Sequence, residues 1–279
     1  MKIIECPRDA MQGVKQFIPT SIKIKYINQL LKVGFDTIDF GSFVSPKTIP
    51  QLKDTSKVLK GLDLTNTSSN LLAIIANTKG ANYACAFEEI NYIGFPLSVS
   101  EEFQKRNTKK TINQALQDIE DIQNLLTKHN KQLVVYLSMA FGNPYNEYYH
   151  PDIAANLTEK LNRLEVNIIA LSDTIGVSNS DNISNLFCTL VKEYPKIEFG
   201  AHFHTNKLQW KEKVDAAYNN GCRRFDTAIK GYGGCPMAKD ELIGNMPTEK
   251  IINYFSNNTN LNLEELDKCM DLTNYIWKN

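Results

Sequence analysis

The chain has 279 residues, of which 42% are hydrophobic and 22% charged, ordinary values for a globular protein. Basic and acidic side chains both number 31, so a formal net charge of zero excludes long-range attraction to nucleic acid or to an anionic membrane. The six cysteines form no C-x-x-C pair, and neither a leader peptide nor an apolar run of about 20 residues is recognisable, so we expect a reduced, cytoplasmic protein.

Short apolar runs alternate with longer amphipathic stretches along the chain. In chain order the patterns predict strand 2–6, helix 20–34, strand 35–43, helix 49–62, strand 71–77, a short helix, strand 90–95, helix 112–129, strand 132–141, helix 151–165, strand 166–173, helix 180–194, strand 197–204, helix 208–221 and strand 222–229. Further helical segments follow the last strand.

Eight strand–helix units in about 250 residues predict an α/β fold, a (β/α)8 TIM barrel with additional C-terminal helices. No linker or low-complexity tract divides the chain, so residues 1–279 are expected to form a single TIM-barrel catalytic domain. An open doubly wound sheet is the alternative, but nothing like G-x-G-x-x-G follows the first strand to support it.

The segment GAHFHTN, residues 200–206, contains two of the four histidines of the chain. Because side chains alternate along a β-strand, His202 and His204 would point to one face and Phe203 to the other. Two imidazoles on one face can bind a single metal ion. The tripeptide by itself equally allows a pair of hydrogen-bonded histidines at a strand end.

Polar residues lie at the ends of several of the predicted strands or directly after them, where a barrel carries its chemistry. They are Glu5, Arg8, Asp9, Asp39, Ser138, Asn143, Asp173, His202 and His204. Any one of these carboxylates could be a helix cap, but the joint pattern indicates a site. Asp9 with the two histidines offers one oxygen and two nitrogens to a divalent ion, and Asn245 could add a carbonyl oxygen. Such a mixed set suits magnesium or manganese as well as zinc.

The glycine-rich stretch GYGGCP, residues 231–236, is too short for a phosphate-binding Walker loop and lacks its Gly-Lys-Ser/Thr end. Its glycines predict a mobile loop that carries Cys235. A simple turn is the alternative interpretation. A thiol on a loop above a metal site is nevertheless a candidate proton carrier, since Lys230 and the metal charge would favour its thiolate.

The chain resembles the hydroxymethylglutaryl-CoA lyase family of metal-dependent TIM-barrel lyases. The shared motifs occur in the family's order and are IIECPRDAMQ, SFVSPKTIPQ, NTKG, SEEFQKRN, LSDTIGV, HFH, GYGGCPMA and GNMPTE. Each motif is weak alone, and together they are specific. The resemblance implies a carbon–carbon lyase that cleaves 3-hydroxy-3-methylglutaryl-CoA to acetoacetate and acetyl-CoA by a retro-Claisen reaction.

The resemblance also implies roles for individual residues. A divalent cation, Mg²⁺ or Mn²⁺ in preference to Zn²⁺, would be held by Asp9, His202, His204 and Asn245. Arg8 would neutralise negative charge on the thioester oxygen, and Cys235 would move a proton. Asp173 and Asp39 would shape the site and its proton path. The expected substrate-binding residues are Arg8, Gln12, Ser138, Gly233 and Gly234.

Five positions depart from the family's usual pattern. The family usually has glutamate at Asp39, alanine at Lys230, leucine at Tyr232, an aromatic residue at Met237 and cysteine at Asn143. We expect these changes to surround the acyl pocket, where they would bear on the choice of substrate.

Other functions compete with this interpretation. A Claisen-type synthase of the same barrel group would share the Arg-Asp and His-x-His elements, but generally lacks the Gly-Gly-Cys-Pro loop and carries an added regulatory domain. Cleavage of a related 3-hydroxyacyl-CoA, or metal binding without catalysis, are further alternatives. The expected partner is a small acyl-CoA, with Lys47, Lys105 and Lys109 as candidates for its phosphates. No nucleic acid or membrane partner is expected. The expected assembly is a homodimer.

Overall fold

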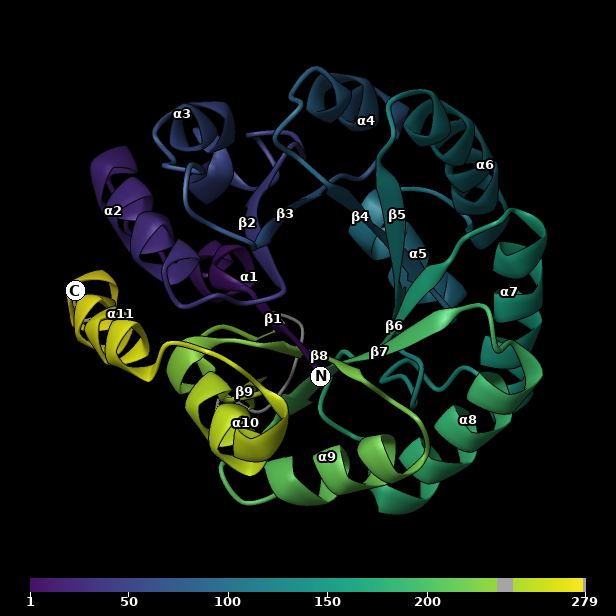
Figure 1. The fold of residues 1–279 in the computed structure, drawn as a ribbon. Helices are drawn as coiled ribbons and strands as arrows, with labels where there is room; N and C mark the ends of the chain where they lie inside the picture. The colour runs from purple at the N-terminus through teal and green to yellow at the C-terminus, as the bar shows by residue number, and fades with distance from the viewer. Residues whose placement is uncertain (235–242, 278–279) are drawn as a thin grey trace.

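The computed structural model of the protein describes residues 1–234 and 243–277, and eight parallel strands form its centre (Figure 1). They are β1 (Lys2–Glu5), β2 (Thr37–Ser42), β3 (Asn70–Ile74), β4 (Tyr92–Ser98), β5 (Gln132–Ser138), β6 (Ile168–Asp173), β7 (Glu198–Thr205) and β8 (Arg224–Thr227). Each strand pairs with the next in the sequence, and β1 also pairs with β8, so the ring is closed. The predicted TIM barrel is confirmed.

Helices between the strands, together with α10 after the last strand, form the outer layer (Figure 1). They are α2 (Thr20–Leu31), α3 (Thr55–Lys60), α4 (Thr78–Cys85), α6 (Ile112–Lys128), α7 (Pro151–Arg163), α8 (Ser180–Glu193), α9 (Trp210–Asn219) and α10 (Thr248–Tyr254). The longest, α6, begins with a capping box in which Thr111 and Gln114 exchange side-chain and backbone bonds. Its buried residues, such as Ile119 and Leu126, recur at helical spacing and face the barrel.

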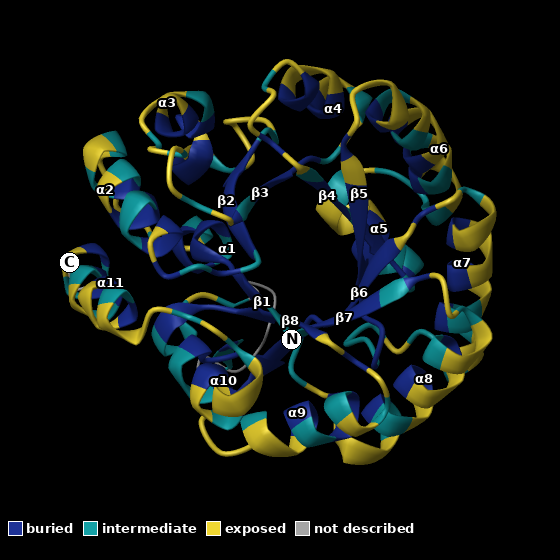
Figure 2. Cartoon of the chain, viewed as in Figure 1, coloured by how far each residue is buried: buried dark blue, intermediate teal, exposed yellow. Residues whose placement is uncertain are grey.

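The strands are buried on both faces, which explains why they read as apolar runs rather than as alternating patterns (Figure 2). One side of the sheet packs against the inward faces of the helices in the main core. The other side fills the barrel with a second apolar cluster made of Leu72, Ile74, Val134, Tyr136, Ile168 and Ala170. This filling leaves the C-terminal mouth of the barrel as the place for a cavity.

Most predicted elements extend past the observed bounds, and three of them have an identifiable cause. The segment 49–62 is a 3-10 turn at Pro50–Leu52 followed by α3, because Thr55 bonds the carbonyl of Leu52 (2.8 Å) and the N–H of Ser42 (3.0 Å) where the helix would continue. The strand predicted to Asn77 ends at Ile74, since Asn77 caps α4. The strand predicted to 141 ends at Ser138, where the next residue adopts a positive φ of 60°.

Several elements were not predicted individually, α10 among them. Helix α1 (Pro7–Gln12) follows β1 directly, with Pro7 in its first turn, and α5 (Glu101–Thr108) follows β4. Strand β9 (Gly244–Asn245) lies antiparallel to β7. Helix α11 (Leu263–Ile276) packs beside α2 (Figure 1). Among the residues described, no helix is long and apolar enough to cross a membrane.

Candidate metal centre and its cavity

Side chains from α1, β7 and β9 meet at the mouth of the barrel. One ligand atom each from Asp9, His202 and His204 lies within 4.8 Å of the others. Asn245 stands opposite His204 in the β7–β9 pairing, and its Nδ2 donates to Asp9 Oδ2 at 2.8 Å. The structure therefore brings together all four residues that the sequence suggested as a metal set.

The two histidines are oriented by other partners rather than by each other. His202 Nδ1 lies 3.1 Å from Asp226 Oδ2, and His204 Nδ1 lies 2.9 Å from the carbonyl oxygen of Thr174. Bonds at Nδ1 leave Nε2 of each ring for a metal. His204 Nε2 is buried without a hydrogen-bond partner among the described residues. A buried nitrogen lone pair with no donor nearby is what a metal ligand requires, so the residues fit a divalent cation.

The charges of the cluster also suit a cation. Burial alone would raise the pKa of Asp9, but the neighbouring charges of Arg8, His202 and His204 lower it to about 2. Burial lowers the pKa of His204, so this ring is neutral and able to coordinate. For His202 burial acts in the same direction, but the bond and charge of Asp226 outweigh it and raise the pKa.

Asn245 has a different orientation from that of a metal ligand. Its amide nitrogen donates both to Asp9 and to the carbonyl oxygen of Tyr232, at 2.9 Å. In this arrangement the amide orients the carboxylate of Asp9. Coordination through the amide oxygen would require the side chain to turn, so this role stays a prediction.

Arg8 connects the metal cluster to a second carboxylate. Its Nε and Nη2 both donate to Asp39 Oδ2, at 2.9 and 2.7 Å. Its Nη1 donates to Asp9 Oδ1 at 3.1 Å and to Gln12 Oε1 at 3.0 Å. The guanidinium is thus held by every nitrogen while one edge still lines the cavity.

Asp39 is fully buried beneath Arg8 and is not among the residues that line the cavity. Burial raises the pKa of its carboxyl to about 6, against the opposing charge of Arg8. Its Oδ1 has no hydrogen-bond partner within the described ranges, so both Arg8 bonds converge on one oxygen. The structure therefore shows Asp39 orienting Arg8, with no contact to a substrate in the cavity.

Asp173 faces away from the cavity. Its carboxylate accepts from Lys213 Nζ at 2.6 Å, from Ser178 Oγ at 2.5 Å and from the N–H of Val177 at 2.9 Å. Lys213 also donates to the carbonyl oxygen of His204 at 3.0 Å. Asp173 therefore holds the turn after β6, and the buried Lys213, which sequence reasoning missed, ties that turn to the β7 histidine.

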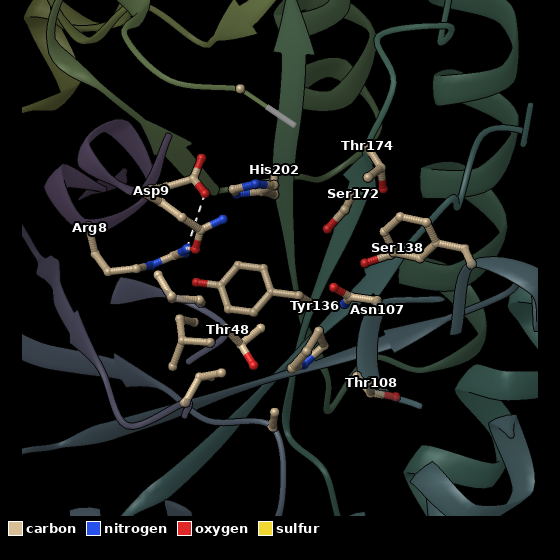
Figure 3. A pocket seen from close by; sticks show the side chains of 18 of the residues that line it. Arg8, Asp9, Thr48, Asn107, Thr108, Tyr136, Ser138, Ser172, Thr174 and His202 are labelled. Atoms are coloured by element: carbon tan, nitrogen blue, oxygen red, sulfur yellow. Dashed lines mark hydrogen bonds and ion pairs between the residues drawn. The ribbon is translucent and has the colours of Figure 1, made fainter. Parts of the chain in front are cut away.

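A cavity of about 390 Å³ opens above the metal cluster (Figure 3). Arg8, Asp9 and His202 form one side of it, and Ser138, Ser172 and Thr174 line another. The rest of the wall is mostly apolar, with Val44, Ile49, Ile74, Pro96 and Phe103 among its residues. A polar end that carries the Arg8 guanidinium and the candidate metal ligands, joined to an apolar wall, fits a small acid attached to a longer, less polar arm.

The predicted substrate residues are distributed unevenly around this cavity. Gln12, Ser138 and Gly234 line it, and Gly233 does not. Gly233 has φ +86°, and a Cβ there would lie 2.7 Å from the Cα of Ala10, so only glycine fits. Sequence reasoning missed the lining residues Thr48, Asn107, Thr108, Tyr136, Ser172 and Thr174. Thr48, Asn107, Ser172 and Thr174 lie within motifs that the chain shares with the family, and that position was the signal that could have identified them.

Four of the five departures from the family pattern do not line this cavity as expected, and Asp39 beneath Arg8 is one of them. Lys230 and Tyr232 direct their side chains to α11, where Lys230 Nζ donates to the carbonyl of Met270 at 3.0 Å. Asn143 bonds the backbone of its own loop, accepting from Tyr145 N at 3.0 Å. The expectation was wrong because tertiary partners determine where these side chains point. Cys235 and Met237 lie outside the described residues.

Glu5 is buried beneath the segment that leads to the glycine residues, where it accepts from Ile229 N at 3.0 Å and Thr248 Oγ1 at 2.5 Å. Burial raises the pKa of this carboxyl to about 8 from its usual 4.5. Between these values the folded state holds a proton that the unfolded state has released, so Glu5 makes the protein less stable as pH rises.

We expect Glu5→Gln to lose less stability than wild type between pH 5 and 8, measured by urea unfolding. Parallel curves for the two proteins would contradict this.

Comparison with known proteins agrees with the geometry of the site. The HMGL-like family profile matches residues 2–275. Human cytoplasmic 3-hydroxy-3-methylglutaryl-CoA lyase is 32% identical, over 100% of this chain and 75% of that protein. The solved HMG-CoA lyase from Brucella melitensis has a TM-score of 0.92 at 27% identity, covering 100% and 99% of the two chains. That from Acinetobacter baumannii, in complex with coenzyme A and 3-methylmalate, has a TM-score of 0.90 at 31% identity, covering 99% and 90%.

Proposed function

Because this chain belongs to the HMGL-like family, we propose that it is a carbon–carbon lyase that cleaves 3-hydroxy-3-methylglutaryl-CoA to acetoacetate and acetyl-CoA. The observation that carries the proposal is the Asp9, His202 and His204 cluster with Arg8 beside it, at one end of a cavity with an apolar wall. Donors of this kind favour Mg²⁺ or Mn²⁺, with Zn²⁺ as the alternative.

The reaction needs a proton removed from a tertiary hydroxyl and negative charge stabilised on a thioester oxygen. A divalent cation bound by this cluster supplies Lewis acidity and lowers the pKa of a hydroxyl that it contacts. As the carbon–carbon bond breaks, its electron pair passes to acetyl-CoA as an enolate, and the hydroxyl carbon becomes the ketone of acetoacetate. Arg8, oriented by Asp39, stabilises the enolate charge. Cys235 is proposed from the sequence to protonate the enolate carbon.

The coenzyme A arm is proposed to leave the cavity between Thr48 and Asn107. Both residues line it, and Lys47 and Lys105 are exposed beside them. These lysines, with Lys109, are proposed to contact the phosphates. A solved relative in complex with coenzyme A supports an acyl-CoA substrate. A cytoplasmic location, a homodimer and a single catalytic domain over residues 1–279 are proposed from the sequence.

The direct test is release of acetoacetate and acetyl-CoA from 3-hydroxy-3-methylglutaryl-CoA by the purified protein. We expect EDTA to abolish turnover and added Mg²⁺ or Mn²⁺ to restore it, since three side chains of the site place ligand atoms within 4.8 Å of one another. A parallel reaction of acetyl-CoA with 2-oxo acids, followed by coenzyme A release, tests for the synthase alternative. Full turnover in metal-free protein would overturn the metal-dependent mechanism.

A further inference from the structure

The C-terminal helix α11 contacts the glycine segment, residues 231–234, through the two residues on either side of Gly231. Lys230 Nζ donates to the carbonyl oxygen of Met270 at 3.0 Å and to Asn274 Oδ1 at 3.3 Å. The ring of Tyr232 stacks on that of Trp277, with centroids 4.6 Å apart and planes 1° from parallel. The segment is therefore attached to α11 at two successive points.

The backbone at this point needs such support. Lys230 has φ +58°, a conformation that side chains other than glycine rarely adopt. Its N–H donates to Glu249 Oε2 at 2.9 Å, which, together with the Nζ contacts, holds the residue from both ends. Gly231 follows with φ +66°, and a Cβ there would lie 2.9 Å from the carbonyl oxygen of Asn245. A shift of Lys230 would therefore move the segment against β9.

Tyr232 joins the contact with α11 to the metal cluster. While its ring lies on Trp277, its carbonyl oxygen accepts from Asn245 Nδ2 at 2.9 Å. The same nitrogen donates to Asp9 Oδ2 at 2.8 Å. The stacked ring and the carbonyl that Asn245 binds both belong to Tyr232. The position of the ring on Trp277 therefore determines the position of the carbonyl, and with it that of the Asn245 amide that orients Asp9.

Helix α11 is itself anchored away from the site. The N–H of Asn262, at its N-cap, donates to the carbonyl of Val33 at 2.9 Å. Gln29 of α2 donates to the carbonyl of Glu265 at 3.2 Å, and Trp277 packs edge-on against Tyr26. These contacts give α11 a fixed place beside α2, independent of the glycine segment.

We infer that α11 is a clamp that positions the glycine segment and Asn245 at the metal centre, with Lys230, Tyr232 and Trp277 as positioning residues. Its effect on turnover rests on the proposed lyase function, whereas its effect on metal binding and on backbone protection does not. The two departures at Lys230 and Tyr232 thus belong to one contact, with α11 as their shared partner.

The test compares two aromatic residues of the same C-terminal segment. Trp277→Ala should weaken Mg²⁺ binding to the metal-free protein by roughly 10-fold in calorimetry and lower kcat by a similar factor, with KM little changed. Tyr275→Ala is the control, because this side chain is 73% exposed. Trp277→Phe keeps a stacked ring and should restore both values. Hydrogen exchange at Tyr232 and Asn245 should quicken in Trp277→Ala and not in the control.

Lys230→Ala extends the test if loss of Trp277 prevents folding, because it leaves the contacts of α11 with α2 intact. It should show the same weaker Mg²⁺ binding and faster exchange. Wild-type Mg²⁺ affinity and exchange in both Lys230→Ala and the folded Trp277 variant would overturn the clamp. If the wild-type protein cleaves no 3-hydroxy-3-methylglutaryl-CoA, the proposed function fails while Mg²⁺ affinity and exchange still decide the clamp.

Discussion

We expect His204→Ala to lower kcat for 3-hydroxy-3-methylglutaryl-CoA cleavage by at least about 10²-fold, because even residues that merely orient metal ligands cost roughly 10–100-fold. The Nε2 atom of His204 is buried and has no hydrogen-bond partner among the described residues. Removing this atom therefore costs a metal ligand and breaks no hydrogen bond at Nε2. The barrel should stay folded. Turnover, Mg²⁺ affinity and melting temperature measured on the same preparation separate loss of the site from loss of the fold.

His129→Ala is the matched control for His204→Ala. His129 is exposed at the C-terminal end of α6, away from the metal cluster, and should keep wild-type turnover and metal affinity. Wild-type turnover in His204→Ala that still depends on added metal would mean that this ring is not a ligand.

We expect Arg8→Gln to lower kcat by roughly 10²–10³-fold, the usual cost of removing one preorganised donor. The negative charge that Arg8 faces grows as the enolate forms, so KM should change far less than kcat. Asp39 should remain tolerated without its partner, because burial raises its pKa to about 6 even against the lowering charge of Arg8, and loss of that charge raises the pKa further toward the uncharged form. Steady-state kinetics at saturating metal measure both constants.

Two further variants make the Arg8 result specific. Arg8→Lys keeps the charge but not the second donor to Asp39, so its kcat should fall between wild type and Arg8→Gln. Arg163→Gln removes an exposed arginine that pairs only with Glu159 in the described structure, and should be silent. An effect of Arg8→Gln confined to KM would mean that Arg8 anchors the substrate without stabilising the enolate.

Much of the fold could be predicted because the signals that carry it are local. Buried parallel strands read as short apolar runs, and the helices between them read as amphipathic stretches, so the alternation identified the barrel. The errors lie where side chains replaced backbone hydrogen bonds, as at Thr55 and Asn77. Strand β9 has two residues and depends on its pairing with His204, which no local pattern reveals.

The candidate site could be predicted as a set of residues but not as a geometry. His202 and His204 share a face because of the period of a strand, and Asp9 follows the first strand. Their supports are Asp226 of β8 and the carbonyl of Thr174, which directly follows β6, and sequence reasoning did not find them. An acidic residue inside a buried strand, as Asp226 is, was the signal that could have identified one of them.

By itself the sequence determined the chemical inventory of this protein: eight strand–helix units, the strand-end polar residues and the His-x-His pair. Only the tertiary structure decided which carboxylate faces the cavity, since Asp9, Asp39 and Asp173 all lie in or shortly after strands and the sequence does not distinguish them. Arg8 lies 31 residues from Asp39, and Lys213 lies 40 residues from Asp173. The physical reason is that a buried carboxylate turns toward the cation that offsets its desolvation, and the fold alone decides where that cation lies.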